Sequence, residues 1–152
     1  MDVNFKTAYN QFYICDSHST GDTASESFWT TEAYDDRLAI EDGILGVGTE
    51  CYGPVKCKVN ILESVNNDFD LQQYDHVVEG GLIINSGTIQ ILDCPNSAMQ
   101  LEIPVKNGDY RVRIYSSNLS SVNGDEGDDF YFVEIWPGAG TGRIVLKRYQ
   151  DY

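Results

Sequence analysis

Apolar and polar residues alternate along most of the chain, a pattern that is typical of strands with one buried face. The alternation is clearest over residues 110–117 and 130–136, which flank a mainly polar loop. Because successive side chains of a strand point to opposite faces, each segment places its aliphatic residues on one side. We therefore predict that the two segments pair as antiparallel strands with a shared core face.

The opposite face of these two segments combines charged and aromatic side chains. It carries Arg111, Arg113 and Tyr115 from the first segment, and Phe130, Phe132, Glu134 and Trp136 from the second. Antiparallel pairing would bring the arginines near Glu134 among aromatic rings. Exposed faces of antiparallel sheets commonly have this composition, so we predict a solvated face and keep a contact surface as the alternative.

Further alternating segments predict a fold built almost entirely of strands. Clusters of Gly, Pro, Asn, Asp and Ser separate them, including a predicted break at Gly80-Gly81 and a hairpin at Ser86-Gly87. These other predicted strands span residues 9–16, 44–51, 55–65, 74–79, 82–85, 88–92, 99–106 and 143–149. Many short strands separated by turns indicate a mainly β fold, an antiparallel β-sandwich, in a single domain over residues 1–152.

One segment has helical character. A threonine at position 30 or 31 is a suitable N-cap, and acidic residues follow it in the next turns. A modest apolar stripe continues to about Glu41, and Gly43 is a plausible C′ residue. The sequence therefore predicts one short α-helix near residues 30–41, packed on the sheet.

The charge of the chain is strongly negative, with 24 acidic residues, 10 basic residues and a formal net charge of -14. Nine of the carboxylates lie between Asp16 and Glu50, where Arg37 is the one cation. Phosphates bind Lys and Arg, so this balance disfavours nucleic acid and anionic membranes as partners. A basic protein partner would be attracted; the alternative is that the charge serves solubility alone.

Neither a transmembrane helix nor a secretory signal is evident, because no long apolar run occurs and the N-terminus lacks a basic region before an apolar stretch. We therefore expect a cytoplasmic protein. The four cysteines have no metal-binding spacing, and in a reducing cytosol they are expected to be free thiols, two or more of them buried. A Cys51–Cys57 disulfide across the Gly53-Pro54 turn is the alternative.

Candidate catalytic and metal-binding residues are sparse. His18 and His76 have no flanking motif that pairs a base with a nucleophile, so we expect neither an enzyme nor a cofactor. Residues 123–129 resemble a calcium loop in composition. They lack its regular spacing of carboxylates and its distal Glu, which favours a solvated acidic loop and no metal.

Several short segments resemble the competence protein J (ComJ) family, small bacterial proteins that inhibit a partner nuclease. The resemblance extends over residues 9–137, with different loops between the matching segments. It implies a nuclease inhibitor or an immunity-type protein, and it transfers no individual contact residue. The residues that carry it are Tyr9-x-Gln11-Phe12, Trp29-Thr30-x-Glu32-Ala33, Asp42-Gly43, Gly108-Asp109-Tyr110 and Asp129-x-Tyr131.

Ten of the 18 aromatic residues are tyrosines, which are favoured at protein interfaces. This tyrosine content, the negative charge and the resemblance together predict a cytosolic immunity protein that inhibits a basic nuclease or toxin by occluding its active site. Carboxylates would pair with the enzyme's Lys and Arg residues, and aromatic rings would supply buried anchors. The predicted partner-binding residues are Phe28, Trp29, Glu32, Asp35, Asp36, Asp125, Glu126, Asp128 and Asp129.

Two other functions stay open. One is a carbohydrate- or calcium-binding sandwich in which the tyrosines and Trp136 would serve as stacking platforms. The other is an enzyme that uses His18 or His76.

Overall fold

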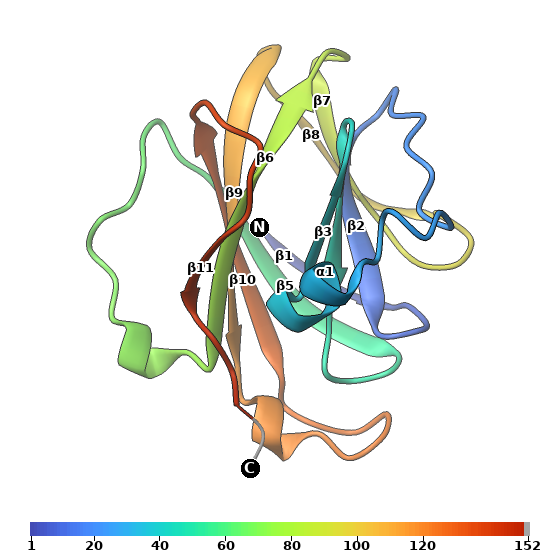
Figure 1. Cartoon of the computed structure of the whole chain (residues 1–152), viewed down its shortest axis with the longest axis vertical. Coiled ribbons are helices and arrows are strands. Elements are labelled where there is room, and N and C mark those ends of the chain that lie inside the picture. Colours follow the sequence, from blue (N-terminus) through green and yellow to red (C-terminus); the bar gives the residue numbers. More distant parts are fainter. Residues whose placement is uncertain (151–152) are drawn as a thin grey trace.

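The computed structural model, which describes residues 1–150, consists of two β-sheets packed face to face (Figure 1). The six-stranded sheet has the order β1-β5-β10-β9-β6-β11, and the five-stranded sheet has the order β3-β4-β2-β7-β8. The first comprises β1 (Asp2–Lys6), β5 (Pro54–Ile61), β10 (Phe130–Pro137), β9 (Gly108–Ser117), β6 (His76–Ile84) and β11 (Ile144–Lys147). The second comprises β3 (Leu38–Glu41), β4 (Ile44–Gly48), β2 (Gln11–Asp16), β7 (Thr88–Leu92) and β8 (Met99–Pro104). The predicted β-sandwich is confirmed.

The core lies between the two sheets and is built from the alternating residues. Val112 and Ile114 of β9 and Val133 of β10 share one hydrophobic cluster with Phe12 and Ile14 of β2. Burial of a side chain of this size stabilises the fold by about 1.5–3 kcal/mol. The aliphatic face predicted for residues 110–117 and 130–136 is therefore confirmed.

Among residues 1–150, strand pairing is antiparallel with one exception. Strands β9 and β10 pair antiparallel as predicted, with Ile114 opposite Val133 and Arg113 opposite Glu134. The exception is β10 with β5, which run parallel with Val133 opposite Val59. Strand β1, which the sequence did not indicate, pairs antiparallel with the other side of β5.

The helix is shorter than predicted. Helix α1 spans Thr31–Asp36, and its N-cap is Thr30, one of the two predicted residues, whose hydroxyl accepts a hydrogen bond from the Ala33 N–H. Arg37 ends it in the left-handed conformation with φ of 61°. Residues 38–41 form β3 instead, since this places the Leu38 side chain in the core. Gly43, predicted as a helix C′ residue, lies with φ of 71° in the turn between β3 and β4.

The other helical segments in the described part of the chain are two 3-10 turns, η1 (Leu71–Gln73) and η2 (Leu119–Ser121). Within residues 1–150, no helix has the length and apolarity needed to cross a membrane.

The predicted break at Gly80-Gly81 is wrong, because β6 runs straight through both glycines. Their missing side chains leave room for what packs on the two faces of β6. A Cβ at Gly81 would lie 2.0 Å from the Gly140 carbonyl oxygen, and one at Gly80 would lie 2.9 Å from the side chains of Leu38 and Ile40. The Ser86-Gly87 turn likewise forms no hairpin; it carries the chain from β6 in one sheet to β7 in the other.

The charged and aromatic face of β9 and β10 is buried, which contradicts the predicted solvated face. Arg113 is 5% exposed, and Arg111, Glu134 and Trp136 are similarly buried. The loop of residues 62–75, on the left of Figure 1, covers part of this face. Its Phe69 ring lies 4.6 Å from the Arg113 guanidinium carbon. The aromatic rings that suggested exposure instead exclude water.

Buried charges on this face are paired. Glu79 of β6 accepts hydrogen bonds from Arg111 Nη2 at 3.0 Å and from Arg113 Nε at 2.9 Å. Tyr115 donates to Glu134 at 2.5 Å. Burial, followed by that carboxylate, raises the pKa of Tyr115, so its hydroxyl stays a donor. We call Glu79, Arg111 and Arg113 the buried ion-pair network.

All four cysteines are free thiols and are buried. The expected free thiols are therefore confirmed, and the alternative Cys51–Cys57 disulfide is not formed.

His76 connects β6, α1 and the C-terminal segment. Its Nδ1 accepts a hydrogen bond from the Tyr149 N–H at 3.0 Å, so the proton of the neutral ring is on Nε2, which donates to the Asp36 carbonyl at 2.7 Å. Burial lowers the pKa of His76 to about 4. Both nitrogens thus have structural partners, and the ring is not placed to act as a catalytic base.

Acidification should destabilise the fold through His76. The unfolded chain takes up a proton on this histidine near pH 6.5, and the folded chain only near pH 4. The stability that the neutral, buried ring contributes is therefore fully present above a pH of about 6.5 and is lost as the pH falls toward 4. The loss is at most about 1.4 kcal/mol per pH unit. Urea unfolding across this range should show a shallower pH dependence for His76→Gln than for the exposed-loop control His18→Gln. Equal pH dependence in the two variants would contradict the assignment.

Removing the central charge of the buried ion-pair network should be costly. Glu79→Gln leaves two buried guanidinium groups without their carboxylate, and we expect a loss of about 3 kcal/mol in the free energy of unfolding. Asp128→Asn, which breaks the exposed ion pair with Lys56, is the matched control and should change little. Chemical denaturation measures both, and equal effects would rule out a special role for the network.

Candidate functional site

Of the predicted contacts on α1, two carboxylates are exposed and one forms ion pairs within the protein. Glu32 and Asp35 are exposed. Asp36, whose side chain is 16% exposed, accepts hydrogen bonds from Arg143 Nε at 3.0 Å and Arg148 Nη2 at 2.5 Å. Burial alone would raise the pKa of Asp36, but these arginines lower it overall. Asp36 therefore anchors the helix to the C-terminal segment.

Two predicted contact residues point inward. Phe28 is 1% exposed and packs against the rings of Tyr13 and Trp29. Asp129 is 3% exposed and accepts hydrogen bonds from the Tyr131 hydroxyl at 2.7 Å and the Cys51 N–H at 3.3 Å. Their side chains hold the loops in place and are not available to a partner in this conformation.

Three further predicted contacts lie on an exposed loop between η2 and β10, and the last, Trp29, lies before α1. Asp125, Glu126 and Asp128 are all exposed there, and Asp128 is 3.4 Å from Lys56 Nζ. Gly124, with φ of 65°, forms the tight turn of this loop. Within residues 1–150, no three His, Cys, Asp or Glu side chains are grouped so that they could hold a metal ion.

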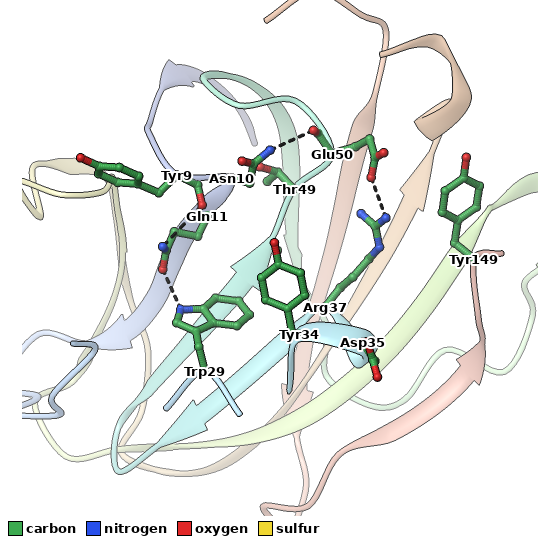
Figure 2. Close-up of a pocket in the computed structure, with 11 residues that line it drawn as sticks. Tyr9, Asn10, Gln11, Trp29, Tyr34, Asp35, Arg37, Thr49, Glu50 and Tyr149 are labelled. Atoms are coloured by element: carbon green, nitrogen blue, oxygen red, sulfur yellow. Dashed lines mark hydrogen bonds and ion pairs between the residues drawn. The ribbon is translucent and has the colours of Figure 1, made fainter. Parts of the chain in front are cut away.

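A groove that the sequence did not predict lies beside α1 (Figure 2). Its volume is about 640 Å³, and four separate segments of the chain line it. We call it the α1 groove. Its lining residues are Tyr9, Asn10, Gln11, Trp29, Tyr34, Asp35, Arg37, Gly48, Thr49, Glu50 and Tyr149.

On one side of the α1 groove, Gln11 positions an aromatic pair. The Gln11 side-chain oxygen accepts hydrogen bonds from Trp29 Nε1 at 2.7 Å and from the Tyr13 hydroxyl at 3.0 Å. The Trp29 ring in turn makes an edge contact with Tyr34, at 6.3 Å between centroids. Tyr34 is 72% exposed, so the pair presents aromatic surface to solvent.

On the other side, Arg37 and Glu50 form an ion pair. Arg37 Nη2 donates to Glu50 Oε2 at 2.6 Å, and the guanidinium carbon lies 5.4 Å from the centroid of the Tyr149 ring. Asn10 Nδ2 donates to the Glu50 carbonyl at 3.0 Å. Figure 2 shows the Tyr34 ring between Trp29 and this ion pair.

The backbone around the α1 groove adopts an uncommon conformation. Of the five non-glycine residues with positive φ in residues 1–150, three line it: Tyr9 at 61°, Asn10 at 58° and Arg37 at 61°. Such residues are costly and concentrate at functional sites. Only Asn10 gave a local signal, since Asn tolerates this conformation better than most residues.

The α1 groove is continuous with the acidic loop. The rings of Tyr9 and Tyr52 make an edge contact at 5.9 Å, and the Tyr52 N–H donates to the Gly124 carbonyl at 3.3 Å. Figure 1 shows the turn before β2, the β4–β5 connection and the loop before β10 at the same end of the sandwich. We call this surface the acidic-aromatic face; it comprises Tyr9, Trp29, Glu32, Tyr34, Asp35, Tyr52, Asp125 and Glu126.

Ion pairing leaves the acidic-aromatic face with its charge uncompensated. Within residues 1–150, six of the ten basic residues form ion pairs, and they do so with Asp36, Glu50, Glu79 and Asp128. The four carboxylates of the acidic-aromatic face have no ion-pair partner among residues 1–150. The face therefore combines free negative charge with exposed tyrosine rings.

Comparisons with known proteins place this fold. No family model and no curated protein matches the sequence. The crystal structure of ComJ, inhibitor of the DNA degrading activity of NucA, from Bacillus subtilis, matches with a TM-score of 0.70 and 17% identity over 91% of this chain and 96% of that chain. The structure of Crocagin biosynthetic gene J matches with a TM-score of 0.57 and 14% identity, again over 91% of this chain and 96% of that chain. The resemblance to ComJ is therefore confirmed at the level of the fold: this chain has the ComJ fold over nearly its whole length.

Proposed function

We propose that this chain is a non-enzymatic, cytoplasmic protein of the immunity type, which binds a basic nuclease and occludes its active site. The observation that supports this most is the fold shared with ComJ, a protein that inhibits a nuclease. Identity of 17% is too low to transfer the function by itself. The charge and shape of the acidic-aromatic face supply the remaining argument.

The free carboxylates on this face complement the surface of a nuclease. An enzyme that binds the nucleic-acid backbone presents Lys and Arg to its phosphates. Glu32 and Asp35 on α1 and Asp125 and Glu126 on the loop would meet such side chains. With a net charge of -14 on the whole chain, the long-range field would also accelerate the encounter.

The exposed tyrosines on this face supply apolar contact area. Tyr9, Tyr34 and Tyr52 are all exposed to solvent. Tyrosine is enriched at protein interfaces because it combines a rigid ring with a polar tip. These rings would form the buried centre of the interface, with the carboxylates around it.

The fold holds the face in a fixed shape before binding. A helix of six residues is not stable in isolation. Here Arg143 and Arg148 hold Asp36, and His76 holds the carbonyl at the same end of α1. A preformed surface loses less conformational entropy on binding, which increases affinity.

A carbohydrate-binding module is the second candidate, favoured by the aromatic and amide side chains of the α1 groove. Trp136, proposed from the sequence as a stacking platform, is buried on the other side of β10 from the core and cannot serve. Trp29 and Tyr34 would take that role. A rise in melting temperature with added saccharide, and none with basic nucleases, would favour this function.

Capture from the native host should identify the partner. Immobilised full-length protein, incubated with host lysate at low salt, should retain a basic nuclease that salt elutes and that added protein inhibits in a DNA-degradation assay. The triple variant Glu32→Lys, Asp35→Lys, Asp125→Lys should bind at least about 100-fold more weakly.

The matched control for charge is Glu63→Lys, Asp68→Lys, Asp109→Lys, which changes three exposed carboxylates outside the acidic-aromatic face. Because it removes the same net charge and leaves the face intact, it should only slow association at low salt and should weaken binding far less than the first triple variant does. Failure of the folded protein to retain any nuclease would refute the proposed function, and equal weakening in both triple variants would refute the proposed face.

The association rate with the captured nuclease should fall steeply with salt. Raising the ionic strength from about 0.01 M to about 0.15 M shortens the Debye length from about 30 Å to about 8 Å, which removes most long-range attraction. Stopped-flow or surface plasmon resonance measurements should show the change mainly in the association rate, with a smaller change in dissociation. A salt-independent association rate would show that electrostatic attraction does not drive the encounter.

A further inference from the structure

We infer that the α1 groove binds an arginine side chain, with the Glu50 carboxylate and the rings of Trp29 and Tyr34 as its contacts. That this arginine belongs to a nuclease bound on the acidic-aromatic face rests on the proposed function. The binding of a guanidinium group by the groove is a property of this chain and can be measured without a partner.

The size and charge of the α1 groove suit a cationic side chain. Its volume of about 640 Å³ is within the range of small-ligand sites, so it admits a whole arginine side chain. Two carboxylates, Asp35 and Glu50, and one cation, Arg37, line it. An incoming cation would therefore enter a site with one excess negative charge.

Glu50 has unused hydrogen-bonding capacity. Its Oε2 accepts from Arg37, and no donor to Oε1 is present in residues 1–150. The side chain is 28% exposed, so the second oxygen can be reached. A carboxylate can accept from two guanidinium groups, and such charge-assisted hydrogen bonds are the stronger ones.

Arg37 shows that this environment accommodates a guanidinium group. It is hydrogen-bonded to Glu50 and lies over the Tyr149 ring, which is the combination of carboxylate and aromatic face that arginine favours. Figure 2 shows Tyr34 across the ion pair from Tyr149, with Trp29 beyond it, so the Trp29–Tyr34 pair offers a second aromatic surface in the same groove. The indole N–H of Trp29 is held by Gln11, so its ring is fixed before a ligand arrives.

Arginine fits these contacts better than lysine does. Its planar group stacks on an aromatic ring while its N–H groups donate within the plane, whereas an ammonium is a compact, strongly hydrated charge. The groove offers both kinds of contact around one opening.

The two tryptophans of the chain provide the test. Trp29 lines the groove, and Trp136 is buried among the arginines of the six-stranded sheet, so the two indole N–H signals of the ¹⁵N-labelled protein separate binding from unfolding. Titration with N-acetyl-arginine amide should move the Trp29 signal, with a Kd on the order of 1 mM for so small a ligand. N-acetyl-citrulline amide has the same shape without the charge and should leave it unmoved, and N-acetyl-lysine amide should bind more weakly than arginine.

Glu50→Gln should weaken arginine amide binding at least about tenfold, since the charge-assisted hydrogen bond is lost. Glu63→Gln, the matched change of one exposed carboxylate outside the groove, should not. An unchanged Trp136 signal confirms that each variant is folded. An unmoved Trp29 signal with arginine, equal shifts with citrulline, or a shift with saccharides alone would overturn the inference.

The outcomes separate this inference from the proposed function. If arginine amide binds and no nuclease is inhibited, the groove stands as a guanidinium site and the inhibitor function fails. If the unmodified protein and the variants Tyr34→Ala and Glu50→Gln all inhibit a nuclease equally, the inhibitor function stands and the groove does not anchor the nuclease.

Discussion

The buried ion pairs between Glu79 and two arginines, Arg111 and Arg113, constrain the rest of the structure. A charge removed from water is costly unless it is paired and hydrogen-bonded, so strands β6 and β9 must keep the register that joins them. The same arginines donate to the carbonyls of Asn66 and Gly140. Two loops far apart in the sequence are thereby fixed over the outer face of the six-stranded sheet, which becomes a second interior.

This use of arginine determines the electrostatics of the surface. Arginines that pair inside the fold or against Asp36 do not compensate the carboxylates on α1 and the loop before β10. Four carboxylates on this face therefore keep their negative charge unpaired, while other exposed carboxylates, such as Glu63 and Asp109, lie elsewhere on the surface. What distinguishes the acidic-aromatic face is that its unpaired carboxylates lie beside exposed tyrosines and a groove.

The position of α1 connects the sheets to this face. The helix has six residues and one buried side chain, Ala33, so little of its stability comes from its own sequence. Side chains from β6 and the C-terminal segment hold its end, and Arg37 turns the chain directly into β3. The α1 groove exists because these distant segments meet there, and its shape depends on the integrity of both sheets.

The sequence by itself determined most of the strands, though not β1 or β3, and the aliphatic face of β9 and β10, because alternation is local. It also located the helix cap to one of two threonines, of which Thr30 is used. It also indicated the acidic residues on α1 and the 125–128 loop. Only the tertiary structure decided that the arginine face is buried, since the loop that covers it begins about 50 residues earlier in the chain. The inward positions of Phe28 and Asp129 and the α1 groove were equally beyond a local pattern, because each depends on contacts between segments that pairing of the sheets brings together.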